Sequence, residues 1–278
     1  KIPLINQLFE KKSLASQLQK EERFFHFWKQ QNLSKIDYIT TLNTVASVSN
    51  NLSWIFFSAY QCAIRHHFKQ KINATISLAV REISDAPIKT TFDNKKNILL
   101  LSGKKSWLVS TNVDMILLYV KLGKSIEFPL NNKTHFLNSV LVPLYREKST
   151  IRETFGQVKF LKNLNQGSLT LKDTKIMSMN IFSGKDIRGF GYVEQFFVML
   201  SLGIFFVTKV NNMKYKRMFF EAVKALIIDF NRRKSPKMTV RFHKKSFKKM
   251  IHIFDSLPER KVIIDWEFDK NIFFNLLK

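Results

Sequence analysis

Cysteine is almost absent from this chain, because its 278 residues include only Cys62. An internal disulfide is therefore excluded, and a single thiol fits a reducing compartment. The first six residues lack the apolar stretch of a signal peptide. The most apolar segment, residues 196–207, is shorter than the ~20 residues that cross a bilayer. We therefore expect a cytoplasmic protein with no membrane span, and we interpret this segment as part of a buried helix.

Acidic residues are also scarce: 21 Asp and Glu stand against 46 Lys and Arg, a formal net charge of +25. Such a surface attracts polyanions, namely nucleic acid, anionic lipid, phosphorylated ligands or an acidic carrier protein. Between Asn231 and Lys249 the chain has cations and no Asp or Glu, and we expect the cations to form a continuous basic surface: Arg232, Arg233, Lys234, Lys237, Arg241, Lys244, Lys245, Lys248 and Lys249. The alternative is a solvated face. No zinc-ligand spacing or nucleic-acid motif accompanies the cluster, and we expect no metal site.

The hydrophobic pattern changes twice along the chain. Residues 1–71 carry apolar side chains at three- and four-residue steps, which indicates amphipathic helices. Residues 72–183 alternate short apolar runs with turn residues, which indicates a small antiparallel sandwich or barrel. Residues 184–278 return to helical periodicity. The chain therefore predicts an α+β fold with a helical N-terminal domain (1–71), a central antiparallel β domain (72–183) and a C-terminal helical domain (184–278).

Individual elements follow from the same patterns. The expected strands are Ala74–Val80, Lys89–Phe92, Ile98–Leu101, Ser106–Val109, Met115–Val120, Val140–Leu144, Gln157–Phe160 and Thr174–Met179. A turn at Ser102-Gly103 makes a hairpin of the third and fourth. The expected C-terminal helices are Tyr192–Val210, Lys214–Arg232 and a shorter one, Phe247–Ser256.

Three segments resemble one family. Ser102-Gly-Lys-Lys-Ser-Trp-Leu-Val-Ser-Thr-Asn112, followed by Val113-Asp114 and an apolar strand, is similar to the N-G-x-K-x-W-I-T-N…A-D segment of the acyl-CoA dehydrogenases. Two weaker matches lie in the family's order. Residues 44–54 resemble its helix before the β domain, and residues 169–176, leading to Gly184 and Gly189-Phe190, resemble its exit into the C-terminal helices.

The resemblance implies a fold and a chemistry. The family consists of flavoproteins with a helical N-terminal domain, a central β domain and a C-terminal helical bundle, which is shortened here because few residues follow Gly189. It implies α,β-dehydrogenation of an acyl thioester, carried on coenzyme A or a carrier protein, with hydride transfer to FAD. Members with this fold assemble as homo-oligomers or with a partner subunit.

The resemblance also assigns flavin-binding residues. Trp107 would be the platform for the flavin ring, because an aromatic side chain excludes water from a hydride-transfer centre; the alternative is a core tryptophan on a strand. The family's Thr two residues later is Val109 here, which has no side-chain donor, so Ser110 or Thr111 would replace it. Counting back from Trp107 places Ser77 at the position of another flavin-binding hydroxyl, and Ser84-Asp85 resembles the family's G-S-D.

The reaction also needs a carboxylate base. The family places it in one of two positions, and at the first, on the helix that opens the C-terminal bundle, this chain has Glu194. The alternative for Glu194 is a solvated carboxylate that stabilises the helix dipole. At the second position, before the last helix, Asp265 and Glu267 are the candidates. Two functions follow: an active flavoenzyme, or a catalytically inactive protein of the same fold, without flavin, that serves as a partner subunit or binds a polyanion.

Overall fold

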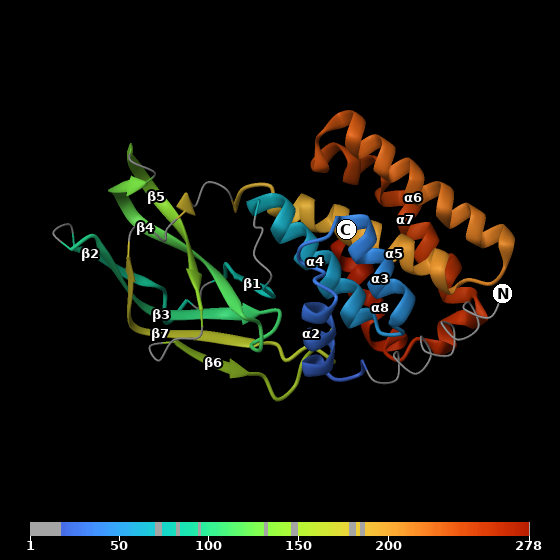
Figure 1. Cartoon of the computed structure of the whole chain (residues 1–278), viewed down its shortest axis with the longest axis horizontal. Coiled ribbons are helices and arrows are strands. Elements are labelled where there is room, and N and C mark those ends of the chain that lie inside the picture. The colour runs from blue at the N-terminus through green and yellow to red at the C-terminus, as the bar shows by residue number, and fades with distance from the viewer. Residues whose placement is uncertain are drawn as a thin grey trace. The chain divides into compact units, whose positions relative to one another are not determined.

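The computed structural model describes residues 18–69, 74–81, 84–93, 96–130, 133–145, 150–177, 182–183 and 187–277. Gly184 and the last two residues of the expected strand Thr174–Met179 lie outside this part of the chain. The chain forms two compact units (Figure 1). The helical unit comprises residues 1–73, 159–163 and 189–278, and the β unit comprises 74–158 and 164–188. The division into three domains at residues 71 and 183 stays a prediction.

Helices from both ends of the chain build the helical unit. They are α2 (Glu21–Gln30), α3 (Tyr38–Val48), α4 (Leu52–Phe68), α5 (Phe190–Lys209), α6 (Met213–Arg233), α7 (Pro236–Ser256), the 3₁₀ helix η3 (Pro258–Val262) and α8 (Trp266–Leu276). Side chains cap several of their N-termini: Asp37 accepts the backbone N–H of Thr40 before α3, and Asn212 accepts that of Lys214 before α6.

Helix α5 is the centre of this unit, because α3, α4, α6 and α7 all pack against it. Thirteen of its residues are buried, and the buried positions surround the helix rather than marking one stripe. By length and composition α5 is the one helix among the described residues that could cross a membrane, but 72% of its most apolar window is buried inside the structure. A buried core helix passes the same test, so this is weak support for a span.

Helix α7 is longer than the sequence pattern indicates. The expected helix covers Phe247–Ser256, whereas the structure begins α7 at Pro236. Proline fits the first helical turn, where its missing N–H is not needed, and Ser235 accepts the N–H of Met238 as the cap. Its buried residues recur every three to four positions between Thr239 and Phe254. The many lysines between them had hidden this periodicity from the hydrophobic pattern.

The β unit contains two four-stranded sheets. One has the order β1-β4-β5-β8, and the other β2-β3-β7-β6. The strands are β1 (Ile76–Ala79), β2 (Lys89–Asp93), β3 (Ile98–Leu108), β4 (Met115–Leu130), β5 (Lys133–Leu144), β6 (Thr150–Thr154), β7 (Gly167–Met177) and β8 (Phe182–Ser183). All pairs are antiparallel except β1 with β4, which is parallel. The predicted α+β class, with helices on either side of an antiparallel-rich β unit in the sequence, is confirmed.

Two local expectations were wrong. Residues 98–108 form one strand and not a hairpin: β3 continues through Ser102-Gly103 with a shift in register. Gly103 has a φ of 137°, and a Cβ there would lie 2.4 Å from the carbonyl oxygen of Pro87, so the residue serves a bulge and not a turn. No strand forms at Gln157–Phe160, because residues 159–163 join the helical unit, where the N–H of Leu161 donates to Asp269.

Gly203 on α5 tests the close packing of the helical unit. A Cβ at this position would lie 2.5 Å from Cγ2 of Val223 on α6 and 3.1 Å from Cε1 of Phe247 on α7. We therefore expect Gly203→Ala to lower the free energy of unfolding by about 1–3 kcal/mol, because the core cannot accept the added methyl group without moving. Urea unfolding followed by circular dichroism measures the change.

Gly191, near the start of the same helix, is the matched control. A Cβ there meets nothing within 4 Å. Gly191→Ala should leave stability unchanged or raise it by up to about 1 kcal/mol, because alanine favours the helix. Equal effects of the two substitutions would show that Gly203 is not a point of close approach.

Candidate functional site

Trp107 lies near the end of β3 and is half-buried. Its indole Nε1 donates to Oε1 of Gln166 at 3.0 Å, just before β7 begins. The side chain is therefore oriented by a polar contact and keeps part of its surface accessible. A tryptophan that served only as core filling would be fully buried, as Trp28 and Trp54 are.

Ser77 and Ser110 each accept a hydrogen bond from the backbone that follows Trp107. Oγ of Ser77, on β1, accepts the N–H of Val109 at 3.0 Å, and Oγ of Ser110 accepts the N–H of Asn112 at 3.0 Å. Both side chains are fully buried. Among the described residues, neither hydroxyl hydrogen has an acceptor. Two buried hydroxyls thus retain a donor close to the loop that follows Trp107.

Thr111 supports the shape of that loop. Its backbone N–H donates to the carbonyl oxygen of Asn165 at 2.8 Å, and its Oγ1 bonds the same carbonyl at 3.1 Å and Oγ1 of Thr154 at 2.7 Å. Gly167 lies against it, since a Cβ on Gly167 would be 2.4 Å from the methyl group of Thr111. The Thr111 hydroxyl therefore already has two partners, one at the end of β6 and one just before the start of β7.

Ser84 is placed differently from the other four. It is exposed in a turn that follows the segment after β1. No hydrogen bond within the described residues connects it to Ser77, Trp107, Ser110 or Thr111. The structure therefore brings four of the five predicted flavin-binding residues into one region of the β unit and leaves Ser84 outside that hydrogen-bonded group.

The sequence patterns missed Lys105, two positions before Trp107. Its side chain is fully buried, its Nζ donates to the carbonyl oxygen of Val80 at 3.1 Å, and it lies 6.0 Å from the centre of the Tyr119 ring. A buried lysine is unusual. No pattern could have found it, because Lys104 and Lys105 are adjacent and only the register shift in β3 decides which one points inward.

Glu194 lies in the first turns of α5 and is partly buried. The residues one turn before and after it, Phe190, Phe197 and Val198, are all buried and apolar. Burial raises the pKa of the Glu194 carboxyl to about 7. No hydrogen bond or ion pair links its carboxylate to any described residue. A carboxyl group that is held in apolar surroundings, unpaired and half-ionised near neutral pH, has the properties of a general base.

Aromatic side chains from α4 pack against the same part of α5. The rings of His67 and Phe190 are centred 5.6 Å apart, and Tyr60 lies 6.1 Å from Phe190. The ring of His66 is 5.5 Å from that of Phe197. Glu194 therefore occupies a helix whose neighbouring surface is aromatic. The described residues contain no group of three or more His, Cys, Asp or Glu that could hold a metal ion.

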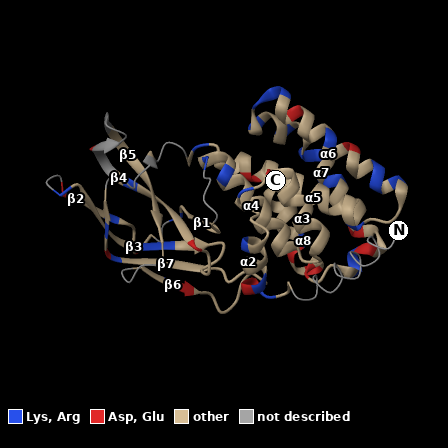
Figure 2. Cartoon of the chain, viewed as in Figure 1, with Lys and Arg blue, Asp and Glu red and all other residues tan. Residues whose placement is uncertain are grey.

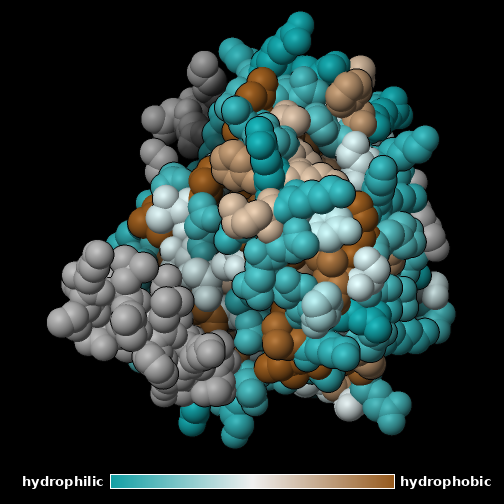
Figure 3. Space-filling view, turned by 90° about the vertical axis from the view of Figure 1, so that its right-hand side faces the viewer, coloured by the Kyte–Doolittle hydropathy of each residue, from teal (hydrophilic) through white to brown (hydrophobic). Residues whose placement is uncertain are grey.

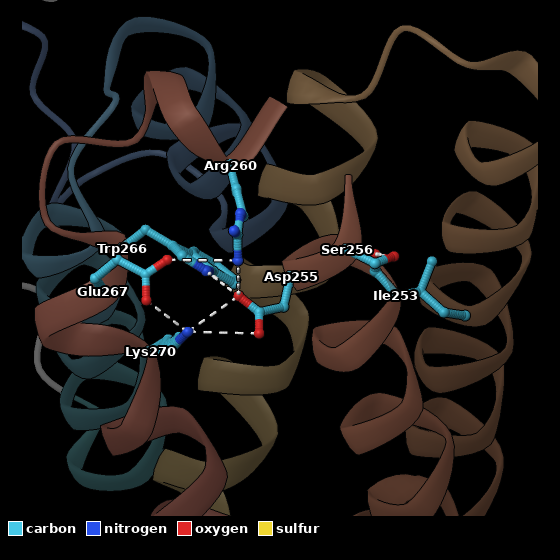
Figure 4. A network of polar contacts seen from close by, with 7 residues as sticks. All are labelled: Ile253, Asp255, Ser256, Arg260, Trp266, Glu267 and Lys270. Atoms are coloured by element: carbon cyan, nitrogen blue, oxygen red, sulfur yellow. Dashed lines mark hydrogen bonds and ion pairs between the residues drawn. The ribbon is translucent and has the colours of Figure 1, made fainter. Parts of the chain in front are cut away.

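The two alternative bases have structural partners. Glu267 forms ion pairs with Lys270 at 2.7 Å and Arg260 at 3.5 Å, in a network that also joins Asp255 to Trp266 (Figure 4). This network fixes η3 and α8 against the end of α7. Glu267 therefore has a structural role in a surface ion-pair cluster and is the weaker candidate for the base.

Asp265 caps α4. Its carboxylate accepts the backbone N–H of Leu52 at 2.7 Å and that of Ser53 at 3.1 Å, across more than 200 residues of sequence. Ser53 Oγ donates between Asp265 and Asp269, at 3.2 and 3.1 Å. Burial, together with the neighbouring Asp265 carboxylate, raises the pKa of Asp269 to about 7. Asp265 and Asp269 are thus a structural carboxyl pair that joins α4, α8 and residue 161.

Comparisons with known proteins agree with this architecture at the level of the fold. No protein-family model matches the sequence, and no curated protein sequence is significantly similar to it. Solved structures with the acyl-CoA dehydrogenase fold, a class of flavoproteins, match almost the whole chain. The chain therefore has that fold, and the resemblance seen in the sequence is confirmed as one of architecture.

Three structures illustrate the match. An FAD-dependent dehydrogenase superposes with a TM-score of 0.61 at 9% identity, covering 100% of this chain and 97% of that one. The HsaA monooxygenase from M. tuberculosis gives 0.62 at 10% identity, covering 98% and 90%. Butyryl-CoA dehydrogenase from Megasphaera elsdenii gives 0.58 at 8% identity, covering 97% and 94%. Dehydrogenases and monooxygenases share the fold, so the fold alone does not select a reaction.

The pH dependence of stability tests the carboxyl pair. The pKa of Asp269 is raised from the ordinary 3.8 to about 7 on folding, so its ionisation opposes folding, and the free energy of unfolding falls as the pH rises from about 4 to about 7. Asp269→Asn keeps an acceptor and a donor at this position and cannot ionise. We expect this fall to be lost in the variant, which should exceed the parent in stability above pH 7 by up to roughly 4 kcal/mol. Urea unfolding at several pH values measures it.

Asp265→Asn is the comparison variant. It weakens the cap of α4, so we expect it to lower stability by about 1–2 kcal/mol near pH 4. Because the Asp265 carboxylate contributes to the raised pKa of Asp269, the fall in stability between about pH 4 and pH 7 should become smaller in this variant but not vanish. Parallel stability curves for the parent and Asp269→Asn would contradict the assignment of a raised pKa to Asp269.

Proposed function

We propose that this protein is a flavin-dependent oxidoreductase that removes hydrogen from the α- and β-carbons of an acyl thioester. The observation that carries the proposal is Glu194: a partly buried carboxyl without a described partner, with a pKa of about 7, on the helix where the resembled family places its base. The acyl-CoA dehydrogenase fold and the half-buried Trp107 support the flavin part of the proposal.

The base has a defined task in this reaction. An α-proton of a thioester is weakly acidic, and a carboxylate with an ordinary pKa is a poor acceptor for it. Burial among apolar side chains raises the proton affinity of Glu194 and keeps water from competing for the same proton. A bound flavin would supply the hydride acceptor.

The residues of the β unit fit a flavin in part. Trp107 offers an accessible aromatic surface, and the buried hydroxyls of Ser77 and Ser110 keep one donor each. These three are the residues we assign to the flavin. Thr111 would act through the shape of the loop, because its hydroxyl is already bonded. Nothing in the structure supports a role for Ser84.

The substrate would be an acyl group on coenzyme A or on an acidic carrier protein. Coenzyme A and an acidic carrier protein are both anionic, and the formal net charge of +25 on this protein attracts either of them over a long range. We further propose that the protein works as a homo-oligomer or with a partner subunit, which the resemblance implies.

A catalytically inactive protein of the same fold is the second candidate. Val109 favours it, because this buried side chain without a donor stands where the resembled family has a hydroxyl. Such a protein would keep the fold and its charged surface, and would serve as a partner subunit or bind a polyanion.

Flavin binding separates the two candidates. We expect the purified protein to show the flavin absorption band near about 450 nm after reconstitution with FAD. Trp107→Ala should weaken FAD binding by up to about 10-fold, because an aromatic contact contributes up to roughly 1.5 kcal/mol. Trp107→Phe keeps an aromatic ring and should weaken it less than about 3-fold. Fluorescence titration with FAD measures all three proteins.

A control is needed for the fold of the β unit. Urea unfolding of Trp107→Phe and Trp107→Ala should show that both variants are folded in the buffer of the titration, although Trp107→Ala loses more ring packing and should be the less stable of the two. A parent protein that does not bind FAD at any concentration tested would favour the inactive candidate. Equal FAD affinity in all three proteins would remove Trp107 from the site.

Glu194→Gln tests the base. We expect the rate of dehydrogenation to fall by about 10²–10⁴, because the amide cannot accept a proton, while FAD binding is unchanged. In the parent, the rate should rise with pH through about 7, where the Glu194 carboxyl ionises, and this limb should disappear in the variant. Exchange of the substrate α-proton with deuterated water measures the same step without complete turnover.

Glu221 on α6 is the control for Glu194. It is exposed to solvent, so the same Glu→Gln change there removes a carboxylate outside the proposed site. Glu221→Gln should leave rate and pH profile unchanged. Proton exchange that persists in Glu194→Gln would assign the base to another residue.

A further inference from the structure

Helix α7 has two different sides. Its buried side packs in the helical unit through residues between Thr239 and Phe254. The opposite side is exposed to solvent, and we call it the α7 outer face; it consists of Lys237, Met238, Arg241, Phe242, Lys245 and Lys249. Residues 238, 242, 245 and 249 recur at steps of three and four, so they form a single stripe along the helix. Blue segments mark α6 and α7 in Figure 2.

Within the part of the chain that the structure describes, the cations of this face have no carboxylate partner. Arg241, Lys245 and Lys249 form no salt bridge with any described residue, and Lys237 lies 5.7 Å from the ring of Tyr192. Asp229, on the neighbouring helix α6, is already paired with His243 at 3.1 Å and Arg233 at 3.2 Å. The positive charge of the α7 outer face is therefore available to an external anion.

Two large apolar side chains stand among these cations. Phe242 is 65% exposed and Met238, one turn before it, is 49% exposed. The guanidinium of Arg233, at the end of α6, lies 5.1 Å from the centre of the Phe242 ring. On the side of the molecule that lies to the right in Figure 1, Figure 3 shows hydrophobic residues exposed between hydrophilic ones. The α7 outer face therefore combines exposed cations with two exposed apolar side chains that lie one turn apart.

The chemistry of the face favours one class of polyanion. Lys and Arg alone bind the phosphates of double-stranded nucleic acid, but that contact makes no use of the exposed Met238 and Phe242. An anionic bilayer instead offers phosphates to Lys and Arg and an acyl boundary to Phe and Met at the same depth. The long lysine side chains can extend to the phosphates while the apolar groups enter the boundary.

We propose that the α7 outer face docks the protein on an anionic phospholipid surface, with α7 parallel to the membrane plane. The cations contact lipid phosphates, and Met238 and Phe242 enter the boundary between headgroups and acyl chains. The protein lies on the bilayer and does not cross it. This inference is independent of the proposed enzymatic function.

Vesicle co-sedimentation of the full chain tests the proposal. Phosphatidylcholine vesicles with about one third phosphatidylglycerol are compared with pure phosphatidylcholine vesicles over a salt series. The parent should bind the anionic vesicles at least about 10-fold more tightly, and raising the salt should weaken this binding. A double-stranded DNA fragment is titrated in the same buffers.

Two double variants separate charge from apolar contact. Met238→Ser with Phe242→Ser leaves the charge unchanged and should weaken vesicle binding about 10-fold while DNA binding stays within about 2-fold. Lys245→Glu with Lys249→Glu should weaken both by more than about 10-fold.

The β unit supplies matched controls. Phe136 on β5 is 68% exposed, so Phe136→Ser removes an equally exposed phenylalanine from elsewhere. Lys172 and Lys175 on β7 are exposed, so Lys172→Glu with Lys175→Glu makes the same charge change. Both controls should bind vesicles within about 3-fold of the parent.

Three outcomes would overturn the proposal. One is a parent that does not bind anionic vesicles at low salt. Another is a Met238→Ser/Phe242→Ser variant that binds vesicles as the parent does, which would leave only a non-specific charge effect. The third is DNA binding that is tighter than vesicle binding at equal salt, which would assign the face to nucleic acid.

Discussion

Burial of α5 on every side is the constraint on which the helical unit depends. A helix that is apolar all round cannot rest on one partner, so it needs helices in several directions. The chain supplies α3 and α4 before the β unit and α6 and α7 after it. Gly203 lets α6 and α7 approach closely, and Ser201 Oγ donates to the carbonyl oxygen of Ile55 on α4. The burial of α5 therefore depends on helices from both sides of the β unit in the sequence.

Polar groups fix the arrangement that apolar packing alone would leave loose. Asp265 caps α4 from α8, and Asp269 receives the N–H of Leu161 from the short segment that visits the helical unit. These contacts join three distant parts of the sequence. They also place a carboxyl with a raised pKa inside the unit, which costs stability as the pH rises. The carboxyl pair of Asp265 and Asp269 therefore fixes the positions of these segments but lowers the stability of the folded protein near neutral pH.

The change of hydrophobic period from helical to strand-like and back was enough to predict the α+β class, and the residues around Trp107 were enough to indicate the fold. The details that failed depend on long-range contacts. Gly103 looks like a turn residue, but its neighbour Pro87 makes it a bulge within one strand. Residues 157–160 look like a strand, but residue 161 bonds to a carboxylate 108 residues away. No local pattern contains that information.

For the candidate site the limits are similar. Sequence position singled out Glu194, and apolar surroundings support it. Asp265 seemed equivalent from sequence, because a carboxylate that caps a distant helix and one that awaits a proton look the same in one dimension. Only three-dimensional partners separate them, since Asp265 accepts two backbone N–H groups and Glu194 has no described partner. A carboxyl that is partly buried in apolar surroundings and has no described partner is therefore the better candidate for chemistry.

The same reasoning applies to the surface charge. On α7 the buried positions are set by packing, whereas the outer positions are free to vary without disturbing the core. Like charges at these positions repel one another, and exposed apolar groups between them add no packing to the core. A sequence under stability constraints alone would intersperse acids there, as the cluster of Asp255, Glu267 and Lys270 does at the other end of the helix. The inner side of α7 holds the fold along the whole helix, and the basic outer side is consistent with the proposed contact with an anionic surface.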